Sequence, residues 1–119
     1  MVDSGQVKGI LEELDNDSNI VNSMVVSRSG MHIAGQAPPG AHIETFVAMS
    51  AILLGSAETA ITDLKGELEN VLVELDRSRI IIESAGNKAL LVVTTNTKEN
   101  LGPLVAQIKK AASDIAQIL

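Results

Sequence analysis

The chain has 119 residues, a formal net charge of −6 and no cysteine, and 45% of its residues are hydrophobic although it contains one Phe and neither Trp nor Tyr. This length fits one domain, residues 1–119, with a core of aliphatic side chains. The negative charge and the scattered Lys and Arg residues argue against a nucleic-acid partner, which needs basic patches. The lack of cysteine excludes disulfides, thiolate metal sites and thiol catalysis.

The N-terminus carries no targeting signal that we recognise. The sequence MVDSGQVKGI has an acid where a signal peptide has basic residues, and no long apolar run follows it. No segment approaches the about 18 to 20 unbroken apolar residues of a membrane helix. We therefore expect a cytoplasmic protein without membrane insertion.

The first half of the chain predicts a helix, a hairpin and a longer helix. Aliphatic residues at positions 7, 10, 11 and 14 repeat at the spacing of one helical face, and Asp3 or Ser4 could cap that helix. Strands are predicted over residues 20–27 and 31–35, joined by a tight turn at 28–30. After a proline loop, the long helix is predicted from about His42 to Leu64.

The second half predicts three strands and a closing helix. The strands cover residues 69–76, 79–84 and 88–95. The last is apolar on both faces and should be central, whereas the first alternates and should lie near an edge. The closing helix is predicted to begin near Asn100, with Gly102 and Pro103 in its first turn.

The long helix has two faces without charge. At about 100° per residue, the face expected to cover the sheet consists of Ile43, Phe46, Val47, Leu53, Leu54, Ala57, Ile61 and Leu64. The opposite face should be charged, but it holds Ala48, Met49, Ile52, Gly55, Ser56 and Thr59. A central strand that is apolar on both faces needs the other two helices on the far side of the sheet. We therefore expect a second subunit on this face, rather than cover from the same chain.

The sequence predicts no catalytic, cofactor or metal site. His32 and His42 have no metal-ligand spacing to each other or to an acid, and the carboxylates are spread over helix surfaces and turns. The segment DLKGE lacks the upstream Gly of a phosphate-binding loop, and SRSG joins two strands instead of a strand and a helix, unlike a nucleophile elbow. We expect no enzyme activity of its own.

Four segments together resemble the roadblock/dynein-light-chain family over nearly the whole chain: IVNSMVVSRSGMHIAG, FVAMSAILLGSAETAITDL, ENVLVELDRSRIIIESAGNKALLVVTT and NLGPLVAQIKKAASDIAQIL. They are most similar to the compact, MglB-like prokaryotic members that accompany small Ras-like GTPases. The resemblance implies an α+β fold with a five-stranded antiparallel sheet, the long middle helix on one face and the terminal helices on the other. It also implies pairing through the long helix and the strand after it, which adds Val71 and Val73 to the interface.

The function that the resemblance implies is that of a homodimeric, non-catalytic regulator or scaffold of a small Ras-like GTPase. In MglB-like pairs the dimer rearranges the catalytic groups of the GTPase, so no arginine finger is required from Arg28, Arg77 or Arg79. A nucleotide-independent structural adaptor is the alternative, and a heterodimer with a paralogue stays open. A small-molecule sensor is the weakest hypothesis, because ligand pockets usually contain aromatic side chains.

Overall fold

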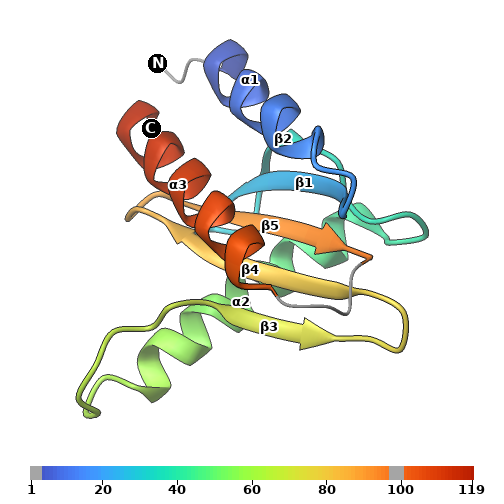
Figure 1. Ribbon diagram of the computed structural model, residues 1–119. Coiled ribbons are helices and arrows are strands. Elements are labelled where there is room, and N and C mark those ends of the chain that lie inside the picture. The colour runs from blue at the N-terminus through green and yellow to red at the C-terminus, as the bar shows by residue number, and fades with distance from the viewer. Residues whose placement is uncertain (1–3, 97–100) are drawn as a thin grey trace.

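The chain forms a helix, two strands, a second helix, three strands and a last helix, in the order expected from the sequence (Figure 1). The computed structural model describes residues 4–96 and 101–119. The elements are α1 (Ser4–Asp15), β1 (Ile20–Ser27), β2 (His32–Gly35), α2 (Ile43–Ala60), β3 (Val71–Glu74), β4 (Arg79–Ala85), β5 (Ala89–Thr95) and α3 (Gly102–Ile118). The strands form one antiparallel sheet in the order β2-β1-β5-β4-β3.

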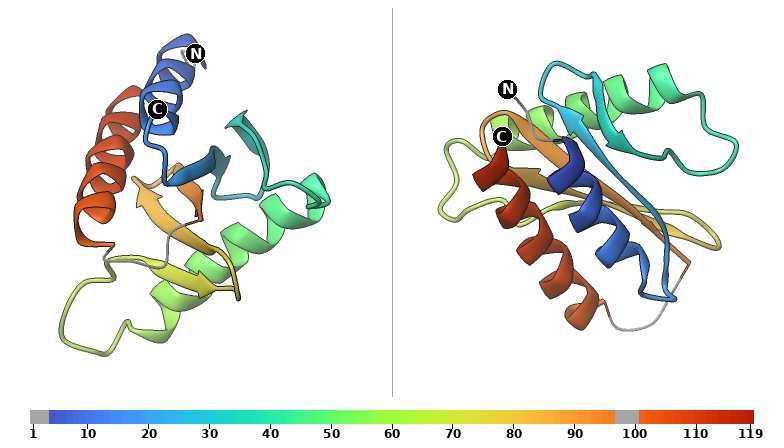
Figure 2. Two further views of the ribbon diagram at one scale, coloured as in Figure 1. Left: turned by 45° about the vertical axis from the view of Figure 1, so that its right-hand side comes forward. Right: turned by 90° about the horizontal axis from the view of Figure 1, so that it is seen from above.

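The sheet lies between two layers of helix (Figure 2), with α1 and α3 side by side on one face and α2 on the other. Each face has its own core. Leu91 and Val93 pack with α1 and α3, whereas Leu90 and Val92 pack with α2. Because successive strand residues point to opposite faces, the apolar run in β5 supplies both cores. The predicted fold is confirmed.

The strand β5 is the centre of the sheet. It pairs with β1 on one side and β4 on the other, so that Val92 lies opposite both Met24 and Ile82, and each of its seven residues is buried. At the sheet edge, β3 has four residues and pairs with β4 alone among the described strands. Both positions agree with the sequence prediction.

A glycine at the end of β2 allows α1 and the hairpin to approach closely. Gly35 has φ +85°, and a Cβ at this position would collide with the carbonyl oxygen of Ser23 and crowd the side chain of Leu11. The side chain of the same Ser23 contacts the end of α1, where its hydroxyl donates to the Asp15 carboxylate at 2.7 Å. The end of α1 is therefore fixed to the sheet.

The long helix ends earlier than predicted, at Ala60 instead of Leu64. The Thr62 hydroxyl donates to the carbonyl of Glu58, and the amide of Thr62 turns to Thr59 instead of Glu58. A threonine side chain that bonds the backbone in this way competes with helix continuation. The predicted caps Asp3 and Asn100 lie outside the described residues.

The contact of α2 with the sheet is narrower than predicted. Only Val47, Ser50 and Leu54 are buried, and the Ser50 hydroxyl is accommodated by donating to the Phe46 carbonyl at 2.8 Å. Of the residues expected to cover the sheet, Ile43, Leu53 and Leu64 are exposed. The prediction was wrong for these three because Leu53 lies beside the contact, Ile43 is at the helix start and Leu64 follows the helix end.

Candidate interaction surface

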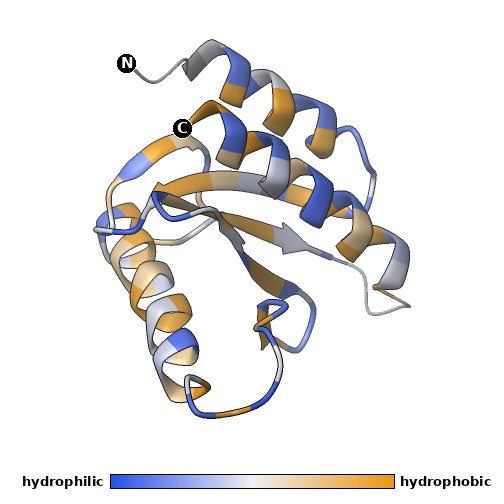
Figure 3. Ribbon diagram, turned by 90° about the vertical axis from the view of Figure 1, so that its left-hand side faces the viewer, coloured by the Kyte–Doolittle hydropathy of each residue, from blue (hydrophilic) through white to orange (hydrophobic). Residues whose placement is uncertain are grey.

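The outer side of α2 is apolar and open. Met49, Ile52 and Leu53 have exposed fractions of 46%, 53% and 44%, in a helix whose only acids are Glu44 and Glu58. Figure 3 shows apolar and weakly polar colours along much of α2, whereas α1 and α3 alternate between hydrophilic and hydrophobic turns. Large exposed apolar patches on small domains mark interaction sites.

The structure brings together most of the residues that the sequence predicted for an interface. Ile52, Gly55, Ser56 and Thr59 line one shallow hollow on α2, and Met49 is exposed one turn earlier. Ala48 is set apart from them, because it is half-buried beneath the β1–β2 turn. A Cβ built at Gly30 in that turn would lie 3.1 Å from the Cα of Ala48.

The remaining predicted interface residues lie on the edge strand β3. Val71 and Val73 are half-buried, and Val71 packs against the core beneath α2. Leu72 points to the other face of the sheet, since it pairs with Ile81 of the α1–α3 core, and it is 47% exposed. In the described part of the chain, no further strand pairs with the outer edge of β3. Exposed edges of this kind are templates for strand pairing with another chain.

Sequence reasoning missed one exposed residue on the outer side of α2, Leu53, and one on the opposite face of the sheet, Leu72. The helical wheel places Leu53 against the sheet because it treats a broad apolar arc as one face. Strand alternation places Leu72 on the same face as Asn70 and Glu74, which is partly solvated. A long apolar side chain on such a face could have indicated a contact surface.

Arg28 attaches the second half of α2 to the sheet. Its guanidinium donates to the Glu58 carboxylate at 2.6 Å, to the Ser84 hydroxyl at 2.8 Å and to the Gly86 carbonyl at 2.9 Å. Arg79 donates to the Glu74 carboxylate at 2.9 Å. Both guanidinium groups therefore serve contacts within the chain.

Glu83 is a buried acid that the sequence prediction did not single out. It lies on the same face of β4 as Ile81 and Ala85, which pack against α3, and it is only 7% exposed. Its Oε1 is buried without a hydrogen-bond partner, and burial raises the pKa of this carboxyl from 4.5 to about 7. Strand alternation from Ile81 would have placed this acid in the α1–α3 core.

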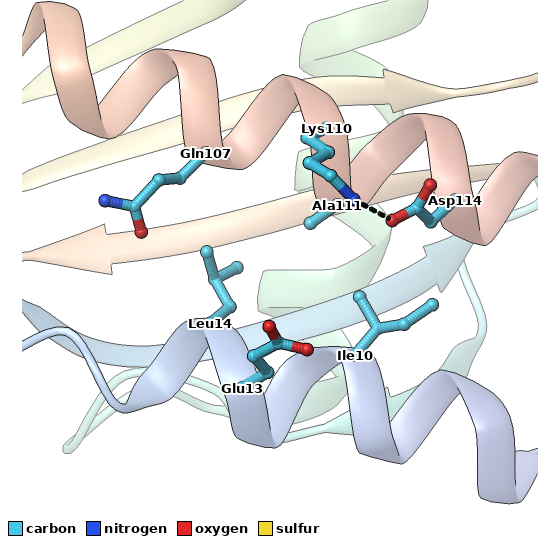
Figure 4. A pocket seen from close by; sticks show the side chains of 7 residues that line it. All are labelled: Ile10, Glu13, Leu14, Gln107, Lys110, Ala111 and Asp114. Carbon is cyan, nitrogen blue, oxygen red and sulfur yellow. Dashed lines mark hydrogen bonds and ion pairs between the residues drawn. The ribbon is translucent and has the colours of Figure 1, made fainter.

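A small cavity lies between α1 and α3, with a volume of about 160 Å³ (Figure 4). Ile10, Leu14 and Ala111 form its apolar part, and the Lys110 ammonium pairs with the Asp114 carboxylate at 3.0 Å on its rim. Small-molecule sites usually have about 300 to 1,000 Å³. The cavity is a seam between two packed helices, and it gives the sensor hypothesis no support.

The two histidines have local structural contacts. His42 caps the start of α2, where its Nδ1 accepts from the Thr45 amide at 3.4 Å, and His32 Nε2 lies 2.7 Å from the Gly35 carbonyl oxygen. Within residues 4–96 and 101–119, no group of three or more His, Cys, Asp or Glu side chains could hold a metal ion.

By length and composition alone, α2 is apolar enough to cross a membrane. However, Val47 and Leu54 fix one side of the helix to the sheet, and Glu58 pairs with Arg28. One side of α2 is therefore part of the protein core.

The fold is thus an antiparallel sheet between one helix and a helix pair, with an apolar helix face left open. The chain belongs to the Roadblock/LC7 domain family, which it matches over residues 7–95. Among its relatives is the uncharacterized protein MJ0310 of Methanocaldococcus jannaschii, 35% identical over 107 residues that cover 89% of this chain and 93% of the relative. Another protein of the same organism, MJ0714, is 33% identical over 116 residues and 97% of each chain.

Solved MglB structures share the fold. Myxococcus xanthus MglB has a TM-score of 0.85 at 18% identity, covering 98% of this chain and 89% of that chain. The gliding protein MglB of Thermus thermophilus has a TM-score of 0.83 at 20% identity, covering 97% and 89%. An MglB with a tetrameric arrangement has a TM-score of 0.84 at 21% identity, covering 97% and 88%.

Proposed function

We propose that this protein is a cytoplasmic homodimer that acts as a regulator or scaffold of a small Ras-like GTPase and performs no catalysis itself. The observation that carries the proposal is the open apolar face of α2, with Met49, Ile52 and Leu53, in a chain whose edge strand β3 is also open. The likeness to MglB structures, one of them tetrameric, supports an assembly of this kind.

The geometry of α2 and β3 suits a second copy of the chain. A two-fold contact between edge strands would continue the sheet, and side chains of the two α2 helices would then cover each other. Gly55 and Ser56 lie on this surface and let backbones approach closely. An interface of standard size, about 1,200 to 2,000 Å² in total, is expected.

The kind of regulator that we propose needs no catalytic group from this chain. Arg28 and Arg79 are engaged within the chain, and no metal-binding group is present in its described part. As the resemblance to MglB-like proteins implies, the dimer would act by binding the GTPase and rearranging groups that the GTPase itself supplies.

Light scattering at micromolar concentration tests the dimer, with Gly55→Arg as the disrupting variant. No atom lies within 4 Å of a Cβ built at Gly55, so arginine fits the protomer while placing bulk and charge on the proposed interface. Gly9→Arg is the matched control, since Gly9 is also a helical glycine with nothing within 4 Å. We expect dimers for the wild type and Gly9→Arg, and a folded monomer for Gly55→Arg.

The second part of the test mixes the dimer with Ras-like GTPases of the same organism, loaded with GDP or a non-hydrolysable GTP analogue. Co-elution that depends on the nucleotide supports the proposal. A wild-type monomer would refute the proposed assembly. If the dimer binds no GTPase in either nucleotide state, the structural adaptor replaces the GTPase regulator.

A further inference from the structure

A second hollow lies at the other end of α2, between the first turn of this helix and the β1–β2 turn. Its volume is about 400 Å³, and its lining consists of Gly30, Met31, His32, Ile43, Glu44 and Val47. None of these residues belongs to the surface proposed for the second copy.

The hollow combines apolar walls with one acid, Glu44, and one imidazole, His32. Met31 is 68% exposed and Ile43 is 44% exposed, while Val47 is buried at 4%. The Glu44 carboxylate forms no ion pair with any cation in the described part of the chain. This pattern matches an apolar side chain with a Lys or Arg beside it, and the net charge of −6 also favours a basic contact.

The backbone of the β1–β2 turn is held in place by its own hydrogen bonds. The Ser27 amide donates to the Met31 carbonyl at 2.8 Å, and the Met31 amide donates to the Ser27 hydroxyl at 3.0 Å. Gly30, with φ +88°, rests against Ala48 of α2. Met31 is thus presented by a turn that is already ordered, which reduces the entropic cost of binding.

The hollow and the proposed dimer surface occupy successive parts of α2. With a rise of about 1.5 Å per residue, Ile43 and Thr59 are about 24 Å apart, and Val47 and Met49 are about 3 Å apart along the helix. Ile43 and Val47 lie about 140° or more around the helix from Ile52, whereas Glu44 lies about 80° from it. The apolar part of the hollow therefore projects away from Ile52, while Glu44 lies nearer to the outer face.

We propose that this hollow receives the GTPase, through a surface segment that places an apolar side chain between Met31 and Ile43 and a basic side chain on Glu44. This assignment rests on the proposed function and adds the place of contact and the chemistry of the contacting segment. It divides α2 into an outer face for self-association and an N-terminal end for the partner.

The experiment compares wild type, Met31→Asp, Met31→Leu and Glu44→Lys for binding to the GTPase that the wild-type dimer binds, by titration calorimetry. Circular dichroism and light scattering first establish that each variant is folded and dimeric. Met31→Asp and Glu44→Lys should each weaken binding about tenfold or more, whereas Met31→Leu should bind like the wild type.

The outcomes separate this inference from the proposed function. Normal binding by Met31→Asp or Glu44→Lys overturns the assignment of the hollow while leaving a GTPase partner in place. A folded but monomeric Met31→Asp also overturns it, because the hollow would then belong to the self-association surface. A wild-type dimer that binds no GTPase overturns the proposed function and this inference together.

Discussion

Replacing Glu83 by glutamine should raise the free energy of unfolding above neutral pH and leave it nearly unchanged in acid. Glu83 is 7% exposed in the α1–α3 core, and burial raises its pKa from 4.5 to about 7. Between these two values the folded protein holds a proton that the unfolded chain has released. The free energy of unfolding of the wild type therefore falls as pH rises from 4.5 to about 7. Above about pH 8, Glu83 is ionised in both states and the fall is complete.

The size of the effect follows from the same pKa values. A rise from 4.5 to about 7 corresponds to a penalty of about 3 kcal/mol for the ionised form. Urea unfolding at about pH 5 and about pH 8 measures it, with far-ultraviolet circular dichroism as the signal because the chain has neither Trp nor Tyr. Protomer concentration must be held constant, since self-association adds to apparent stability.

Glu12→Gln is the control, because Glu12 is an exposed acid on α1. The difference between wild type and Glu83→Gln should grow with pH, whereas the difference between wild type and Glu12→Gln should stay small and constant. An equal pH dependence for wild type and Glu83→Gln would refute the reasoning, and Glu83 would then have to be solvated or paired.

Three further variants test the core, the hairpin and the mechanism. Leu54→Ala should cost about 2 to 5 kcal/mol in thermal or urea unfolding, since Leu54 is 1% exposed, while Leu64→Ala at a 65% exposed position should change little. Gly35→Ala should lower stability by more than about 2 kcal/mol because of its positive φ and the collision with Ser23, and normal stability would contradict the close approach described for β2. Arg77→Ala should leave any GTPase activation intact; an arginine finger contributes about 10³- to 10⁵-fold, and a loss of that size in single-turnover hydrolysis would overturn the proposed mechanism.

The sheet could be predicted from the sequence because its central strand has a strong local signal. Residues 89–93 are continuously apolar, which indicates cover on both faces, and the structure places helices on both. Because the two terminal helices were expected on one face of the sheet, α2 was expected to be the only helix on the other face. The open face with Met49 and Ile52 follows from this layout.

The sequence did not reveal that Leu53 stays exposed beside Met49 and Ile52. Leu53 and Leu54 are adjacent and chemically identical, yet one is 44% exposed and the other 1%. The rotation of the helix about its own axis decides between them, since adjacent residues project about 100° apart, and this rotation is set by the contact of Val47, Ser50 and Leu54 with the sheet. Likewise, the exposure of Met31 depends on how the β1–β2 turn rests on α2. Neither tertiary contact is encoded in a local pattern.

The place of β5 in the sheet also governs how the chain can fold. Its pairing with β1 joins Met24 to Val92, so the middle of the sheet closes only after most of the chain is available. Contacts between residues this far apart in sequence slow folding, and during synthesis α2 leaves the ribosome before the strands β3, β4 and β5 that it covers. Until these strands are made, the nascent chain can cover α2 only with β1, so most of the apolar surface of this helix stays exposed during synthesis.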